Sequence, residues 1–224
     1  MTPRPQRIQR FAAGLRFDTV AHYHCVNGRW RALPLGNLLQ GELASSLAAQ
    51  QAVALLTGRW PHAMRGNADG PPEARALLQW LSPHLSPNAT TSIATTNVVT
   101  LGSAAAQVIE NDGLMLLQMA MLGPTAREVH TCRWVLIVGV EQELESGGHG
   151  PDAPTVCTRA LLVRDSAMDD QWACAHNARL GIGTHAPRED LPRKRRETLV
   201  YRSMDGGLHK VQLLTALSLR PCGP

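Results

Sequence analysis

The order of apolar and polar residues predicts helices in the first half of the chain. Between residues 38 and 57, leucine, valine and many alanines recur at helical spacing, so we expect a buried helix that begins near Ser45 or Ser46. Gly58 ends this helix, and residues 73–81 form a second, amphipathic helix. Residues 103–111 also fit a helix, whereas the apolar run 114–122 fits either a helix or a strand.

The second half of the chain carries the pattern of strands. Residues 133–140 (RWVLIVGV) and 159–164 (RALLVR) are short apolar runs, which predict buried strands. Residues 199–202 and 208–219 predict a terminal hairpin that turns at Gly206 and Gly207. Helices followed by strands favour an α+β fold, in which a helical N-terminal part with a long central helix packs on a C-terminal antiparallel sheet.

The first 35 residues differ from the rest of the chain. They are polar and interrupted by prolines, but they contain aromatic residues, so part of this segment is expected to pack on the domain. We therefore divide the chain into an N-terminal arm, residues 1–35, and one domain, residues 36–224.

Composition narrows the classes of protein that the chain can represent. The 224 residues are 44% hydrophobic, enough for a core, but no apolar run approaches the roughly 20 residues of a membrane span. Five cysteines without a CxxC pair indicate reduced thiols, so we expect a cytoplasmic protein without a membrane segment. The net charge of +4 attracts nucleic acid only weakly.

Three segments occur in an order that is typical of one enzyme family. They are residues 40–48 (QGELASSLA), 133–140 (RWVLIVGV) and 161–166 (LLVRDS). Together they resemble the papain-like cysteine peptidases, including the bacterial branch related to bacteriocin-processing peptidases. In that family a glutamine and a glycine precede the cysteine that begins the central helix. A histidine begins a strand of the pattern H-x-V-x-x-V-G, and an asparagine or aspartate ends the next strand.

The resemblance covers about residues 36–220 and implies a role for four residues of this chain. Gln40 matches the oxyanion glutamine, and Asp165 matches the residue that orients the histidine. Ser46 stands at the nucleophile position and Arg133 at the histidine position, and both depart from the family. With a spacing one residue longer, Leu47 occupies the nucleophile position instead, and again no cysteine is present.

The two departures remove the chemistry that the family uses. A hydroxyl is a weaker nucleophile than a thiolate and needs a nearby base. Arg133 cannot be that base, because a guanidinium stays protonated in proteins. It can instead form a bidentate salt bridge with Asp165, which would turn a catalytic contact into a structural one. A serine pair can also simply cap a helix, and an aspartate after a strand commonly forms a turn.

The resemblance therefore implies a papain-like domain with an impaired catalytic centre. We expect a pseudo-protease that binds a peptide or acts as a scaffolding subunit in a bacterial system, without a cofactor. The alternative is an active papain-like hydrolase that cleaves peptide, amide or isopeptide bonds. It would use Ser46, or a cysteine that Ser46 replaces, with His130 as the base. A β-bulge or a shifted register would be needed to aim His130 at the helix.

Two further features leave other roles open. His22, His24 and Cys25 could contribute metal ligands, but no fourth ligand is evident, so we predict no metal site. The basic run at residues 193–196 could contact phosphates in a nucleic-acid accessory role. Acidic residues flank this run, so a solvated loop is the preferred interpretation.

Overall fold

The fold is known from a computed structural model of the whole chain. The structure describes the following residues: 6–12, 23–26, 29–32, 42–59, 61–62, 71–85, 90–93, 98–123, 129–145, 155–167, 176–182, 198–204 and 206–220.

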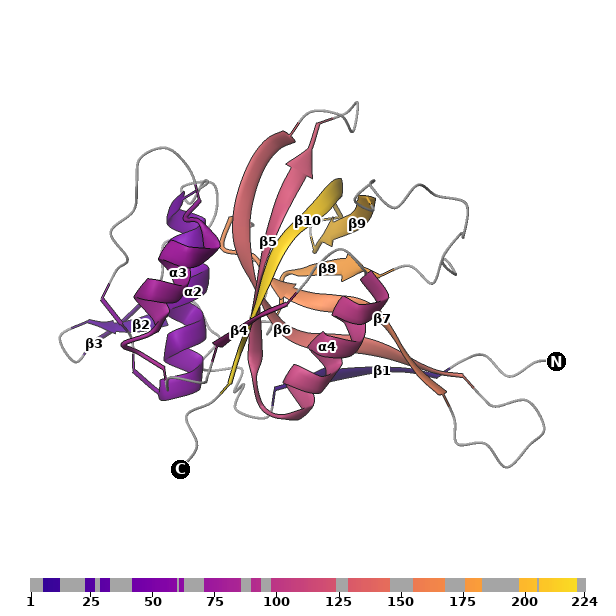
Figure 1. Cartoon of the computed structure of the whole chain (residues 1–224), viewed down its shortest axis with the longest axis horizontal. Coiled ribbons are helices and arrows are strands. Elements are labelled where there is room, and N and C mark those ends of the chain that lie inside the picture. The colour runs from indigo at the N-terminus through magenta and orange to yellow at the C-terminus, as the bar shows by residue number, and fades with distance from the viewer. Residues whose placement is uncertain are drawn as a thin grey trace.

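An antiparallel sheet dominates the described part of the chain, where eight strands belong to it. Strand β6 (Val129–Glu145) pairs with β5 (Leu114–Leu122), which pairs with β10 (Leu208–Leu219). The pairing continues through β9 (Thr198–Ser203), β8 (Ala178–Gly181) and β7 (Thr155–Arg164). Because β7 also pairs with β6, the sheet closes on itself (Figure 1).

Strands from the N-terminal part extend this sheet. Strand β1 (Gln6–Phe11) pairs with β6 from Gly139 onward, beyond the point where β5 ends its own pairing with β6. Strand β4 (Thr90–Ile93) pairs with the last residues of β10. Strands β2 (Tyr23–Val26) and β3 (Arg29–Ala32) form a separate hairpin. The sheet thus joins segments from both ends of the chain.

Helices cover the sheet from two directions (Figure 1). Helix α2 (Glu42–Thr57) contacts β6 and β5, and α3 (Ala74–Leu81) contacts α2. Helix α4 (Val98–Glu110) contacts β6, β7 and β1 and lies across the sheet from α2. Helix α2 is rich in alanine and ends where Gly58 adopts a φ of 69° and donates its N–H to the carbonyl of Ala54.

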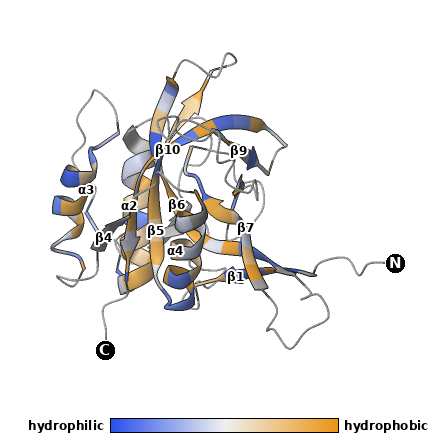
Figure 2. Ribbon diagram, turned by 45° about the vertical axis from the view of Figure 1, so that its right-hand side comes forward, coloured by the Kyte–Doolittle hydropathy of each residue, from blue (hydrophilic) through white to orange (hydrophobic). Residues whose placement is uncertain are grey.

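The core lies between these helices and the sheet. Figure 2 shows apolar residues along β5 and β6, and the middle of both strands is buried on both faces. Trp134 is fully buried, and its indole N–H donates to the carbonyl of Pro72 at 2.8 Å, which ties the segment before α3 to β6. In the described part of the chain, no helix has the length and apolar character that crossing a membrane requires.

The predicted α+β, papain-like fold class is wrong. The chain is built mainly on an antiparallel sheet, and strands β1, β2 and β3 precede the first described helix. Helix α2 has 16 residues and packs on the outside of the sheet, so the described residues do not form a helical N-terminal part with a long central helix. The ambiguous run Leu114–Leu122 is a strand, because its two neighbours β6 and β10 satisfy its backbone.

Candidate functional site

Asp165, the residue that follows β7, is the centre of a buried polar cluster. Its Oδ2 atom accepts a hydrogen bond from Arg133 Nε at 3.0 Å and from the Tyr201 hydroxyl at 2.6 Å. Its Oδ1 atom accepts the backbone N–H of Ala167 at 3.0 Å. The side chain of Asn177 accepts the N–H of Asp165 and donates to its carbonyl, at 2.7 and 2.8 Å. Both the carboxylate and the backbone of Asp165 are therefore held in place.

The ion pair proposed between Arg133 and Asp165 is present in the structure. Arg133 Nη2 lies 2.7 Å from the same oxygen that Nε contacts, and the two side chains are 10% and 0% exposed. Both nitrogens lie near Asp165 Oδ2. In a bidentate bridge two nitrogens contact two different oxygens, so this pair is not bidentate. Arg133 Nη2 lies at ion-pair distance but makes no hydrogen bond there.

The first turns of α2 lie at the edge of the sheet beside this cluster. Strand β7 pairs with β6 only as far as Leu136, which leaves the backbone of Trp134 free on that side. Ser45 Oγ accepts this N–H at 3.0 Å, and further along α2 Gln51 Oε1 accepts the hydroxyl of Ser166 at 3.4 Å. The structure thus brings together the start of α2, the start of β6 and the end of β7.

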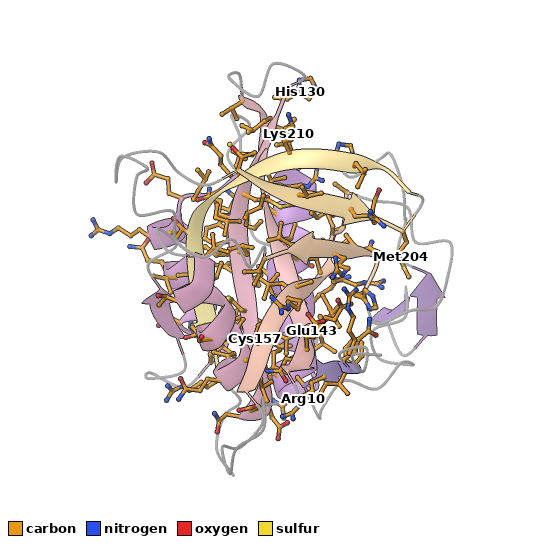
Figure 3. All side chains as sticks on the ribbon, turned by 90° about the vertical axis from the view of Figure 1, so that its right-hand side faces the viewer. Arg10, His130, Glu143, Cys157, Met204 and Lys210 are labelled. Carbon is orange, nitrogen blue, oxygen red and sulfur yellow. The ribbon has the colours of Figure 1, made fainter. Side chains whose placement is uncertain are left out.

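Among the described residues, no hydrogen bond joins Ser46, at the nucleophile position, to His130, the alternative base. Ser46 is buried, and its Oγ atom accepts a hydrogen bond from Gln50 Nε2 at 3.0 Å within the same helix. His130 is exposed near the outer end of β6, three residues before Arg133 (Figure 3). Gln40 lies outside the described residues. The contact of Ser46 is therefore a buried one within a single helix, and it brings no base to the Ser46 hydroxyl.

The protonation of the cluster follows from its burial. Burial, together with the neighbouring Asp165 carboxylate, raises the pKa of Tyr201 well above its usual value. The phenol therefore stays neutral and remains a hydrogen-bond donor to Asp165. The Asp165 carboxylate accepts hydrogen bonds from Arg133, Tyr201 and the backbone of Ala167, so the cluster ties the ends of the strands together.

A second polar cluster lies on the sheet, and it was not predicted from the sequence. Glu141 accepts two hydrogen bonds from Arg179, which lower the pKa of Glu141, and Arg159 pairs with Glu143. The imidazole of His176 packs against Phe11 of β1 with ring centroids 5.7 Å apart, and burial lowers the pKa of His176. The sequence signal was a pair of glutamates at alternate positions of a buried strand, which need cationic partners on neighbouring strands.

Tyr201 and Asn177 are the members of the first cluster that sequence reasoning did not assign. Buried and exposed residues alternate along β9, and Tyr201 is one of the buried ones. Its position on the inner face therefore follows from the alternation of side chains in a strand. Its hydrogen-bond partner is not readable, because Asp165 lies 36 residues earlier. Asn177 precedes β8, and only the pairing of β7 with β8 brings it beside Asp165.

The metal hypothesis concerns residues that the structure describes only in part. His22 lies outside the described residues, and the side chains of His24 and Cys25 in β2 are not described. Among the side chains that are described, no three His, Cys, Asp or Glu residues are arranged to hold a metal ion. The expectation that the protein binds no metal or cofactor stays a prediction.

Comparison with known proteins adds no relative from which a function could be transferred. No protein-family model, no curated protein and no solved structure matches the chain.

Proposed function

We propose that this chain is a non-catalytic domain that binds a protein or peptide partner in a bacterial cytoplasm. The observation that carries the proposal is the buried pair of Arg133 and Asp165, closed by the hydroxyl of Tyr201. Arg133 and Asp165 are the residues to which the peptidase resemblance points, although the chain is built mainly on an antiparallel sheet. The free thiols of Cys132 and Cys157 agree with a reducing compartment.

The chemistry of hydrolysis explains why this pair favours a non-catalytic role. A serine nucleophile needs a proton acceptor within hydrogen-bond reach, typically an imidazole that a carboxylate orients. Here the carboxylate orients a guanidinium, which has no free electron pair to accept a proton. The hydroxyl at the nucleophile position, on Ser46, accepts a hydrogen bond from an amide instead. Both oxygens of the Asp165 carboxylate are thus occupied by Arg133, Tyr201 and the backbone of Ala167.

The experiment compares hydrolysis by the purified full-length chain with hydrolysis by its Ser46→Ala and His130→Ala variants. Fluorogenic peptide and ester substrates are supplied to each protein. We expect no hydrolysis above the background of the assay in any of the three. Hydrolysis that disappears in Ser46→Ala or His130→Ala would overturn the proposal and favour the alternative, an active hydrolase.

A Ser46→Cys variant provides a more sensitive test of the same idea. A cysteine with a competent base nearby reacts with peptidyl epoxide probes that label cysteine peptidases, whereas a cysteine without one reacts slowly. We expect Ser46→Cys to be labelled no faster than the unmodified chain, whose own cysteines provide the background. Rapid labelling at residue 46 would reveal a base and contradict a non-catalytic role.

A further inference from the structure

The outer face of the β9–β10 hairpin exposes apolar side chains between cations. Val200 is 54% exposed and Leu208 is 61% exposed, although both belong to paired strands. Arg202 and Lys210 are exposed on the same hairpin. We call these four residues the hairpin patch. Figure 3 labels Lys210 and also Met204, which follows the end of β9 and is 47% exposed.

The register of the hairpin sets the order of these side chains. Val200 lies directly opposite Lys210, and Arg202 lies directly opposite Leu208. Residues that face each other across an antiparallel pair, or that are two apart along one strand, share a face of the sheet. Each apolar side chain of the patch therefore has a cation across from it and another beside it. The alternate residues of β9 are buried, so the core fixes the direction of the patch.

The charges of the patch lack partners in the described structure. Arg202 stands beside Arg179 of the next strand, and two arginines at opposed positions repel each other. Glu141 neutralises Arg179 through two hydrogen bonds, but neither Arg202 nor Lys210 has an ion-pair partner among the described residues. A partner with carboxylates would offset this positive charge.

Among the described residues, no side chain of β8 covers the patch at Val200. Gly181 is the residue opposite Val200 on that strand, and it has no side chain to cover the valine. A Cβ atom added at Gly181 would meet only the carbonyl oxygen of Val200, at 3.6 Å. An apolar side chain of another molecule can therefore reach Val200 from this side.

We propose that the hairpin patch binds an acidic segment of a partner protein in which Asp or Glu alternates with apolar residues. The inference rests on the proposed function, since it names the surface and the partner chemistry of a non-catalytic binding domain. A peptide of this kind matches both features, because carboxylates meet Arg202 and Lys210 while apolar side chains cover Val200 and Leu208. Nucleic acid matches only the charges, since the patch has no aromatic side chain on which a base could stack.

The experiment measures the binding of labelled synthetic peptides to the full-length chain by fluorescence anisotropy. The test peptide has about eight residues, the length of a strand, with alternating glutamate and valine. One control peptide replaces glutamate with lysine, and another replaces valine with serine. A single-stranded oligonucleotide is titrated in parallel, and each measurement is repeated at low and high salt.

Matched variants separate the patch from general electrostatics. Arg202→Glu/Lys210→Glu reverses two charges of the patch, and Arg59→Glu/Arg75→Glu reverses two exposed charges on or near the helices. Both variants have the same net charge. Val200→Ser removes an exposed apolar side chain from the patch, and Val129→Ser removes one that is 55% exposed at the start of β6. Thermal unfolding confirms that each variant is folded.

We expect the test peptide to bind and both control peptides to bind more weakly. Reversal of the two patch charges should weaken binding about tenfold or more, whereas reversal of the two helix charges should have little effect. Equal effects of the two charge reversals, no binding of the test peptide, or binding of the oligonucleotide alone would each overturn the inference. These outcomes leave the proposed non-catalytic role intact, because that role fails only on Ser46-dependent or His130-dependent hydrolysis or on rapid labelling of Ser46→Cys.

Discussion

The buried pair of Arg133 and Asp165 permits a quantitative test by a double-mutant cycle. Removing one partner of a buried ion pair typically costs about 3–5 kcal/mol, because the other charge stays buried without compensation. Arg133→Met leaves the fully buried Asp165 carboxylate with the hydroxyl of Tyr201 but without a cation. Asp165→Asn leaves a buried guanidinium without a counterion. Each single variant should therefore lose about 3–5 kcal/mol of stability.

The double variant distinguishes this explanation from ordinary packing. If the two costs were independent, they would add to about 6–10 kcal/mol, which is comparable to the whole stability of a typical domain. In Arg133→Met/Asp165→Asn no buried charge is left unpaired, so we expect a loss no larger than that of either single variant. Arg133 Nη2 donates no hydrogen bond to a described residue, and this adds to the expectation, because the intact pair is then itself only weakly favourable.

The assay is urea unfolding followed by tryptophan fluorescence, with free energies extrapolated to water. The exposed pair of Arg10 and Glu110, also 3.0 Å apart, is the matched control, and Arg10→Met/Glu110→Gln should change stability by about 0–1 kcal/mol. Additivity of the two buried substitutions within about 0.5 kcal/mol would refute the coupling. If a single variant does not fold, recovery of folded protein in the double variant is the deciding result.

Three further predictions follow from the packing and the burial of single residues. Gly139→Ala should cost about 1–3 kcal/mol, because its Cβ would lie 2.5 Å from the carbonyl oxygen of Arg10, whereas Gly181→Ala should be nearly neutral in the same urea assay. Burial raises the pKa of Tyr201, so stability should fall as the pH rises above about 10, and urea midpoints should fall less in Tyr201→Phe. Burial lowers the pKa of His176, so stability should fall as the pH drops below about 6.5; a His176→Gln variant with an unchanged acid dependence of its midpoint would contradict this.

Several elements of the structure are encoded in local sequence patterns. The spacing of leucine and alanine predicts a helix that the structure places at Glu42–Thr57, and Gly58 ends it as expected. The terminal hairpin is also read correctly, because its two apolar strands flank a glycine turn in which Gly206 has a φ of 93°. These features depend on residues that are close in sequence, so their physical causes are visible in short windows.

Only part of the candidate site was predictable from the sequence, namely the two residues that belong to the motifs of the resemblance. The peptidase resemblance assigned Arg133 and Asp165 to neighbouring positions of a site, which suggested an ion pair, and the structure contains that pair. It did not reveal that Tyr201 and Asn177 complete the cluster, since each reaches Asp165 only through the pairing of other strands. The polar partner of a buried side chain is set by distant backbone, which no local pattern records.

The tertiary structure alone decided the fold class. The residues of β1 are too few and too polar to predict a strand, yet they pair with the far half of β6 because that edge would otherwise lack hydrogen-bond partners. The run Leu114–Leu122 is a strand for the same reason. A sheet that closes on itself depends on contacts between residues far apart in the chain. Local periodicity therefore predicted individual helices and strands. The arrangement of the strands in the sheet followed from the need to pair every buried backbone group.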